Sequence, residues 1–471
     1  MVHAHEHFII YLKKRLATTV AALLTIFSIA AQTTDENNFP QKQLDIVRQT
    51  HNSLNDNQKR LKKHLDEIAN KQMQAEFSKP RDNSASSADG TPRLRVSLLT
   101  CGPGSEIYEY YGHSAIRVMR TDSAEFDLVF NYGVFDFDSD NFALRFALGE
   151  TDYLCQCQPT KHFLASYERS GRFVDEQVLN LSQEEARRLF AALLDNAKPE
   201  NATYRYNFFY DNCATRVRDI IEKNLNAQIQ YPQRPTERSF RDAVHFYCAA
   251  DKWAIFGQDL LLGSQADLPA SGRELQFVPL IMAQDFGIAT IFEQNSLFPA
   301  LTISSQRIVE AKPRTTTPAF PLSPLGVATI LLIIATIGGA IEYRKSKIFW
   351  PADTTLLLVQ GLAGALVAFM FFFSTHPTVG SNWLVWILNP LPLVGIWWQI
   401  KGALKHNYIS YHIIALPIEG LFVVFSPLMP QKFGTAIILL ALLLLVRHTT
   451  NLLVWHKNRK ALKPLFHTKR K

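Results

Sequence analysis

Cysteine is scarce in this sequence, and its spacing excludes the common zinc sites. The 471 residues contain only five cysteines, which are Cys101, Cys155, Cys157, Cys213 and Cys248. The pair in Cys155-Gln156-Cys157 is too closely spaced for a zinc site, and no second pair completes it. Because five is odd, at least one thiol has no cysteine partner. In an oxidising compartment the other four would allow up to two disulfides, in any of about three connectivities. We expect no metal and no soluble cofactor.

The sequence also has no motif typical of DNA- or RNA-binding proteins. Its net charge of +7 would suit nucleic acid, but the basic residues gather next to apolar segments and in the tail, residues 457–471. That placement is typical of membrane topology and not of a nucleic-acid-binding surface. We therefore exclude nucleic acid as a partner.

Long apolar runs are rare before Pro321 and frequent after it. The mean hydropathy of −0.03, which alone would indicate a soluble protein, averages two different parts of the chain. The apolar runs after Pro321 are residues 325–341, 354–373, 382–400, 411–425 and 433–446. A membrane-spanning helix needs about 17–25 residues, so we predict five transmembrane helices, of which the fourth and fifth are short.

The basic residues between these runs predict their orientation. Arg344, Lys345 and Lys347 follow the first run, Lys401 and Lys405 follow the third, and the basic tail follows the fifth. The loops after the second and fourth runs carry one lysine between them. Cytoplasmic loops are the ones enriched in lysine and arginine, so the first set is cytoplasmic. An odd number of spans then leads from an exported domain to a cytoplasmic tail.

The N-terminus independently predicts export. Lys13, Lys14 and Arg15 precede an apolar run, residues 17–31, that ends in small residues. This pattern is typical of a signal peptide or an uncleaved anchor, and we favour cleavage. Both alternatives export the segment that follows.

The rest of the chain divides by composition. Residues 32–92 are polar, with a thin seven-residue repeat at Val47, Leu54, Leu61 and Ile68 that predicts a solvated surface helix followed by a linker. The predicted parts are residues 1–31 (signal peptide or anchor), 32–92 (helical segment and linker), 93–310 (globular domain), 311–324 (hinge), 325–455 (transmembrane domain) and 456–471 (cytoplasmic tail).

The globular part mixes helical and strand patterns. Residues 93–99, 114–119 and 126–132 are predicted strands. Residues 182–196 and 215–225 are predicted helices, the first with Ser182 and Glu185 as a capping box. We therefore predict an α+β domain followed by an all-α membrane bundle.

Two segments carry the residues of a possible cysteine enzyme, TCGPGSEIYEYYGHSAIRV (100–118) and YRYNFFYDNCATRVRD (204–219). Cys213 follows Asp211 and Asn212, either of which would cap a helix, so its sulfur lies in a first helical turn, where the thiolate is favoured. His113 begins a strand after a glycine-containing turn. A nucleophilic cysteine needs a nearby imidazole, so the two form a candidate dyad.

A third polar group is expected to orient the imidazole. Asn131, in Phe130-Asn131-Tyr132-Gly133 at the end of the next predicted strand, is our candidate, and Asp127 is the alternative. Taken singly, each residue also has a simpler interpretation: a helical cysteine is usually buried packing, and a histidine is usually a satisfied core or surface group.

The motifs GHSAIRV (112–118), NYGVFDF (131–137) and DNCATRVRD (211–219) together closely resemble those of the Lnb-type lipoprotein N-acyltransferase family of Bacteroidota membrane proteins. The resemblance covers about residues 94–285, and the multi-span C-terminus matches as well. It implies a circularly permuted papain-like (NlpC/P60-type) fold in which histidine precedes cysteine. Lecithin:retinol acyltransferase is a distant relative with the same order.

The resemblance implies roles for individual residues. Cys213 would be the nucleophile, His113 the base and Asn131 the orienting group. Further residues flank the motifs and would line the site, although packing, turn formation or salt bridges within the domain would account for them equally well; they are Tyr108, Tyr111, Asn207, Asp211, Asn212, Arg216 and Arg218. His376, in the predicted exported loop, would lie on the same side of the membrane, where an interfacial anchor is the simpler role.

The function implied is two-step transfer of an acyl chain from a membrane phospholipid, through a Cys213 thioester, to the N-terminal amine of a diacylated lipoprotein. The partners would be the bilayer, that phospholipid and that lipoprotein. The location would be the inner (cytoplasmic) membrane, with the catalytic domain in the periplasm. Two alternatives stay open: a papain-like cysteine hydrolase acting on peptidoglycan peptides, and a non-catalytic membrane scaffold that binds a partner through residues 41–77.

Overall fold

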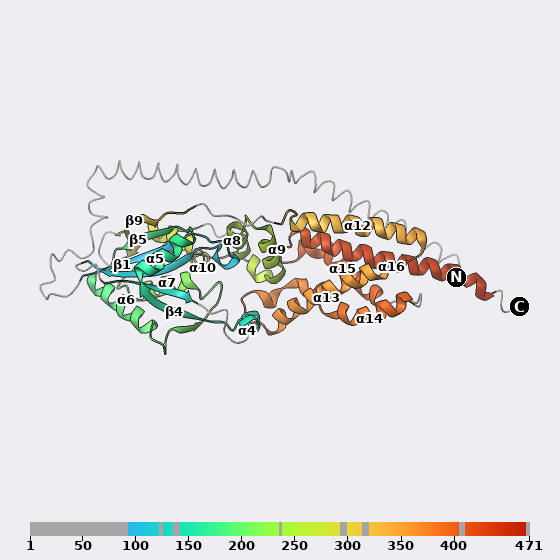
Figure 1. Ribbon diagram of the computed structural model, residues 1–471, viewed down its shortest axis with the longest axis horizontal. Helices are drawn as coiled ribbons and strands as arrows, with labels where there is room; N and C mark the ends of the chain where they lie inside the picture. The colour runs from blue at the N-terminus through green and yellow to red at the C-terminus, as the bar shows by residue number, and fades with distance from the viewer. Residues whose placement is uncertain are drawn as a thin grey trace, which may run out of the picture. The chain divides into compact units, whose positions relative to one another are not determined.

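The computed structural model describes residues 93–121, 126–134, 142–234, 238–292, 299–312, 320–404 and 410–467. All of these belong to one compact unit of the chain, Lys79–Lys471. The predicted signal peptide or anchor, the segment 32–92 and half of the hinge, residues 313–319, lie outside the described residues. Within those residues, a mixed α/β domain precedes a set of long helices (Figure 1).

The α/β domain is built on a seven-stranded sheet in the order β6-β4-β3-β2-β1-β5-β9. Every neighbouring pair is antiparallel. The strands are β1 (Leu94–Cys101), β2 (His113–Arg120), β3 (Asp127–Val134), β4 (Asp152–Pro159), β5 (Val174–Leu179), β6 (Thr203–Arg205) and β9 (Thr302–Val309). The three strands predicted from the sequence are therefore confirmed, as is the α+β class. The architecture is consistent with a permuted papain-like fold, which stays a prediction.

Helices and a small second sheet complete this domain. The helices are α4 (Phe142–Leu148), α5 (Thr160–Arg169), α6 (Gln183–Asn196), α7 (Cys213–Lys223), α8 (Phe240–Tyr247), α9 (Lys252–Leu261), α10 (Gly272–Leu275) and α11 (Pro279–Ile288). Two 3-10 turns are η1 (Ile107–Glu109) and η2 (Ser264–Asp267). The second sheet pairs β7 (Gln228–Gln230) with β8 (Thr290–Phe292).

Helix α7 starts where its sequence dictates. The Asn212 side chain accepts hydrogen bonds from the backbone N–H groups of Ala214 and Thr215, 2.8 and 3.0 Å long, so it satisfies two of the otherwise unpaired donors of a helix start. The helix begins two residues before the predicted 215. Its apolar residues at Ala214, Val217 and Ile221 are fully buried in the main core, and the helix packs on β2 and β3. Cys213 is thereby fixed over the middle of the sheet.

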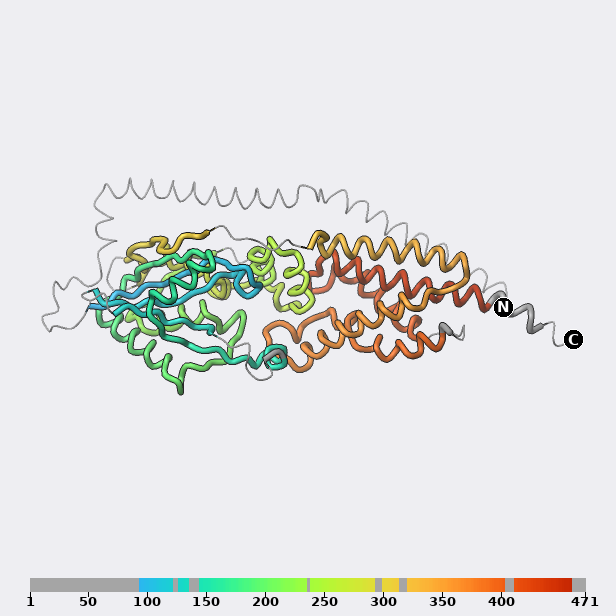
Figure 2. The backbone as a smooth tube through the Cα atoms, viewed as in Figure 1, coloured from blue at the N-terminus to red at the C-terminus, as the bar shows by residue number. Residues whose placement is uncertain are grey.

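Five helices of the second part are long and apolar enough to cross a membrane, which confirms the five predicted spans. They are formed by α12 (Pro324–Lys345), α13 (Trp350–Phe373), η4 (Trp383–Trp386) with α14 (Leu391–Leu404), α15 (Ser410–Phe425) with η5 (Ser426–Leu428), and α16 (Thr435–His467). The turn η3 (Val379–Ser381) follows α13. Helices α12 and α15 both pack against α16, and α13 packs against α14; Figure 2 traces these helices through the backbone.

Helix α16 continues beyond residue 446, where the apolar run of the fifth predicted span ends. Helix α16 continues because the polar residues after that point have buried partners: Arg447 Nε donates to Asp353 Oδ1 over 2.6 Å, and Asn451 Nδ2 donates to Asp353 Oδ2 over 2.8 Å. Arg447 also pairs with Glu342 at 2.8 Å. Charged groups inside a membrane are stable when they are paired in this way, so the helix extends past its apolar run.

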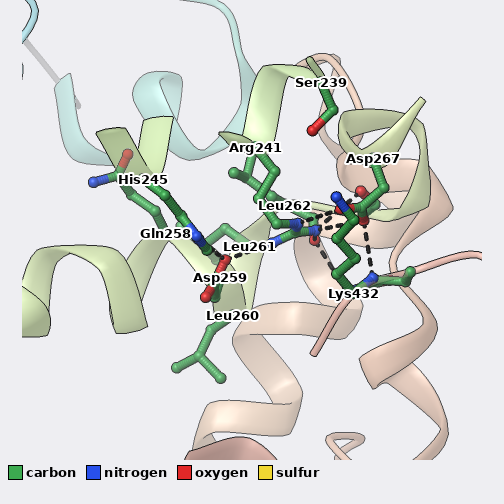
Figure 3. A network of polar contacts seen from close by, with 12 residues as sticks. Ser239, Arg241, His245, Gln258, Asp259, Leu260, Leu261, Leu262, Asp267 and Lys432 are labelled. Atoms are coloured by element: carbon green, nitrogen blue, oxygen red, sulfur yellow. Dashed lines mark hydrogen bonds and ion pairs between the residues drawn. The ribbon is translucent and has the colours of Figure 1, made fainter. Parts of the chain in front are cut away.

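A buried group of charged residues around Arg241 lies where the α/β domain contacts a loop between two membrane helices (Figure 3). Arg241 of α8 binds Asp259 at 2.6 Å and Asp267 at 2.8 Å, and all three side chains are at most 6% exposed. The backbone N–H of Lys432, in the loop before α16, donates to Asp267 over 3.1 Å. We call Arg241, Asp259, Asp267 and Lys432 the Arg241 cluster. No sequence pattern had indicated these residues.

Two amides of the membrane part extend this contact. Asn382 donates to the carbonyl of Leu260 over 2.8 Å, and Gln431 donates to the carbonyl of Leu262 over 3.1 Å. These carbonyls lie at and just after the C-terminal end of α9, where backbone acceptors have no partner within their own helix. The loops of the bundle therefore cap α9.

Candidate active site

His113 and Cys213 lie side by side, at the start of β2 and the start of α7. They are close enough for each side chain to shift the pKa of the other. Both border Gly133 of β3: a Cβ added there would lie 3.5 Å from Cys213 Cβ and 3.8 Å from His113 Cε1. Gly133 has a positive φ of 88°, at a point where the pairing of β3 with β4 shifts register. Only glycine adopts this backbone without strain, so the irregular strand keeps the space between the two residues open.

Asn131 forms a hydrogen bond with the other ring nitrogen of His113, on the side away from Cys213. Nε2–H of His113 donates to Asn131 Oδ1 over 2.5 Å, which leaves Nδ1 as the ring nitrogen for the Cys213 sulfur. The alternative, Asp127, is engaged elsewhere: it binds Arg117 at 2.6 Å and accepts from Thr160 at 2.6 Å. The geometry therefore brings Cys213, His113 and Asn131 together, with the histidine between the other two.

The electrostatics favour a thiolate–imidazolium pair. Burial raises the pKa of the Cys213 thiol, but the charge and hydrogen bond of His113 and a backbone hydrogen bond from Ser114 outweigh it, so the pKa lies below its ordinary value. Burial lowers the pKa of His113, but the charge and hydrogen bond of Cys213 and the bond to Asn131 outweigh it, so that pKa is raised. Each shift therefore stabilises the charged form of its group, the thiolate of Cys213 and the imidazolium of His113.

The other four cysteines differ from Cys213. Burial raises the pKa of Cys101 to about 12 and of Cys155 to about 11, and it also raises the pKa values of Cys157 and Cys248. All five cysteines are free, so neither of the two disulfides that the count allowed is present. Buried thiols with raised pKa values are poor nucleophiles, which singles out Cys213.

We predict that the alkylation of Cys213 by iodoacetamide remains fast at pH values below the ordinary thiol pKa. In Asn131→Ala the imidazolium loses an acceptor, so the pKa of Cys213 should rise and the alkylation profile should move to higher pH. The measurement is the rate of carbamidomethylation of the Cys213 peptide against pH, with Asp127→Ala as the control that leaves the profile in place. A profile unchanged in Asn131→Ala would contradict the orienting role.

Three tyrosines close to Cys213 were missed by the sequence analysis. Tyr153 and Tyr206 stack with ring centroids 4.1 Å apart, and the Cys213 charge raises the pKa of each, after burial, the main cause. Tyr204 is 7% exposed, and its hydroxyl oxygen lies 3.9 Å from the Cβ position at Gly133. The alternation Tyr204-Arg205-Tyr206 is a strand pattern that would have indicated Tyr204 and Tyr206 in the sequence.

The predicted lining residues next to Cys213 serve the local structure. Asp211 and Arg216 form a two-bonded ion pair with distances of 2.6 and 2.7 Å. Asn207 accepts from the backbone N–H groups of Phe209 and Tyr210 and so forms a turn. Asn212 caps α7 and also donates to Phe208 and Phe277 carbonyls. Arg218 pairs with Asp219 at 2.7 Å, as the simpler interpretation expected.

Tyr108 and Tyr111, the two tyrosines before His113 that were predicted to line the site, differ in their surroundings. Tyr111 is buried, and its hydroxyl donates to Gln258 of α9 over 2.6 Å and contacts Cys248 at 3.2 Å. It therefore anchors the turn before His113 to α9 instead of facing Cys213. Tyr108 is 55% exposed. Their predicted place in the site stays a prediction.

His376 lies in the loop after α13 and contacts the α/β domain. Its Nε2–H donates to the carbonyl of Phe146 in α4 over 2.5 Å, and Thr375 donates to the carbonyl of Leu148 over 3.0 Å. This loop therefore caps the C-terminus of α4, which lies beside the end of α13 that faces the α/β domain in Figure 1. His376 is an anchor between α4 and α13 and is not brought to Cys213.

Two family models match the chain. The model described as the Lnb N-terminal periplasmic domain matches residues 84–243, and the model described as the Lnb transmembrane domain matches residues 315–459. No curated protein and no solved structure matches the chain. The first match contains Cys213, His113 and Asn131, and the second contains all five spans.

Proposed function

Because the chain belongs to the Lnb-type lipoprotein N-acyltransferase family, an enzyme family of lipoprotein maturation, we propose that it is itself a lipoprotein N-acyltransferase. It moves an acyl chain from a membrane phospholipid to the N-terminal amine of a diacylglyceryl-cysteine lipoprotein. The observation that carries the proposal is the grouping of Cys213 and His113 beside Gly133, with Asn131 bonded to the far side of the imidazole. Its place of action is the periplasmic side of the inner membrane.

In the first step the Cys213 thiolate attacks the carbonyl carbon of a phospholipid ester. The ester C–O bond breaks, the acyl group is held as a Cys213 thioester, and the leaving lysophospholipid oxygen takes the proton of the His113 imidazolium. A lowered thiol pKa supplies the nucleophile without a separate base, and the raised pKa of His113 keeps its proton available for the leaving group.

In the second step the amine of the lipoprotein attacks the thioester carbonyl. His113, now neutral, takes a proton from the attacking nitrogen, the C–S bond breaks, and the amide is released as the thiolate re-forms. Dividing one acyl transfer into two exchanges at the same sulfur lowers each barrier. The Asn131 amide keeps the imidazole in one orientation through both steps.

The position of α4 supports a lipid substrate. Leu144 and Phe146 of this helix are 53% and 46% exposed, and the loop after α13 caps the helix at the membrane end. Arg145 of α4 binds Asp152, the first residue of β4, at 2.6 Å. An exposed apolar helix thus lies between a membrane span and the strand that carries Tyr153, which suits a substrate arriving from the bilayer.

The hydrolase alternative shares the dyad, and an assay separates the two. The full chain in proteoliposomes of phosphatidylethanolamine and phosphatidylglycerol is given either a diacylglyceryl-cysteine lipopeptide or a peptidoglycan stem peptide. We expect N-acylation of the lipopeptide and no cleavage of the stem peptide, both followed by mass spectrometry. Cleavage of the stem peptide without N-acylation would favour the hydrolase. The scaffold alternative rests on residues 41–77, which lie outside the described residues, and predicts neither product.

A further inference from the structure

The space left by the missing side chain at Gly133 is bordered by three groups. They are Cys213 Cβ at 3.5 Å, His113 Cε1 at 3.8 Å and the Tyr204 hydroxyl at 3.9 Å from the Cβ position of Gly133. The first two are the proposed nucleophile and base. The third belongs to the short edge strand β6 and has no role in the dyad itself.

The Tyr204 hydroxyl is buried and has no hydrogen-bond partner among the described residues. Leaving a buried hydroxyl unpaired costs roughly 1–3 kcal/mol, and such orphans are uncommon in folded proteins and often mark functional positions. Burial, with the Cys213 and Asp211 charges next, raises the pKa of this phenol. The hydroxyl therefore keeps its proton at neutral pH and is available as a donor.

Motif residues hold the Tyr204 ring in place. The Arg216 guanidinium carbon lies 4.0 Å from the ring centroid, and Arg216 is itself fixed by its two bonds to Asp211. On the strand side, Tyr204 pairs with Tyr153 of β4. A cation over an aromatic face restrains the ring, so the Asp211–Arg216 pair acts as a support for Tyr204.

We propose that the Tyr204 hydroxyl donates a hydrogen bond to the carbonyl oxygen of the acyl group as Cys213 attacks it, and that Arg216 and Asp211 are positioning residues for this donor. As Cys213 Sγ bonds to the carbonyl carbon, the C=O π electrons move to the oxygen, and the phenol donates to that oxyanion without losing its proton. When the carbonyl re-forms, the leaving group departs. Donors fixed in advance at such an oxygen are worth about 10²–10³ in rate.

The proposal deepens the proposed function but does not depend on the choice of acceptor. Acyl transfer and peptide hydrolysis both pass through an oxyanion on the Cys213 adduct, whereas alkylation of Cys213 by iodoacetamide passes through none. The ratio of the acylation rate to the alkylation rate therefore measures the contribution of the Tyr204 donor separately from the reactivity of the Cys213 thiolate.

The test uses the full chain in detergent, with p-nitrophenyl butyrate as acyl donor and iodoacetamide as alkylating agent. In Tyr204→Phe we expect acylation of Cys213 to fall by about 10²-fold or more, while the rate of alkylation and its pH profile stay as in the wild type. The matched control is Tyr132→Phe, a neighbouring buried tyrosine whose hydroxyl is bonded to Asn196, which should keep both rates.

Two outcomes would overturn the proposal. Acylation at the wild-type rate in Tyr204→Phe would remove Tyr204 from the reaction, and an equal fall in acylation and alkylation would show a structural role only. Arg216→Lys, which keeps the charge but not the two-bonded geometry, is expected to lower acylation and spare alkylation. Failure of N-acylation alongside normal ester acylation would count against the lipoprotein acceptor and leave the Tyr204 assignment in place.

Discussion

Cells whose only copy of this enzyme carries Cys213→Ala should contain lipoproteins with free N-terminal amines. Removing the nucleophile of a covalent mechanism lowers turnover by many thousandfold, so the loss should be at least about a thousandfold, below detection in cells. The readout is mass spectrometry of lipoprotein N-terminal peptides, which separates the diacylated form from the N-acylated form by the mass of one acyl chain.

The matched control is Cys157→Ala. Cys157 is partly exposed, and burial raises its pKa, so its removal should leave N-acylation at the wild-type level. Normal N-acylation in Cys213→Ala, in cells without a second enzyme for the reaction, would refute the proposed nucleophile.

Arg241→Met should destabilise the protein by about 3–5 kcal/mol, because it leaves Asp259 and Asp267 buried without their positive partner. His245 Nε2 also lies 2.8 Å from the same oxygen of Asp259, so the loss of Arg241 falls most heavily on Asp267. We expect a lower midpoint of thermal unfolding for the full chain in detergent, and a lower amount of the variant in membranes.

Arg307→Met is the control for this prediction. Arg307 pairs with Asp175 through two bonds, but the two side chains are 40% and 33% exposed, and exposed pairs contribute only about 0–1 kcal/mol. Adding Asp259→Asn and Asp267→Asn to Arg241→Met should restore part of the stability, since both orphaned charges are removed. If Arg241→Met unfolds at the same temperature as Arg307→Met, the cluster does not stabilise the junction.

Features set by local sequence were predictable. Ser182 caps α6 and accepts from the backbone of Glu185, as the capping box indicates, and the cap at Asn212 depends only on the residues that follow it. The five spans follow from hydropathy because the membrane selects for apolar length. The places of Cys213 at a helix start and of His113 at a strand start were predictable separately, because each depends on local sequence.

Features set by contacts between distant segments were not predictable. Tyr204 lies beside Cys213 only because β6, a strand of three residues, pairs with the edge of β4. Helix α16 passes residue 446 only because Arg447 meets Asp353, 94 residues away in the chain. The Arg241 cluster likewise combines α8, η2 and a membrane loop. Single-sequence patterns carry no information about such pairings, which tertiary packing decides.

The central claim is that one sulfur receives an acyl chain from phospholipid and passes it to an amine. The most direct measurement is a pulse and chase on the wild-type chain in proteoliposomes that contain phospholipid with an isotopically labelled acyl chain. We predict that the Cys213 peptide gains the labelled chain as a hydroxylamine-sensitive thioester, and that adding diacylglyceryl-cysteine lipopeptide moves the label to its amine. Labelled lipopeptide formed without any acyl group passing through Cys213 would contradict the account.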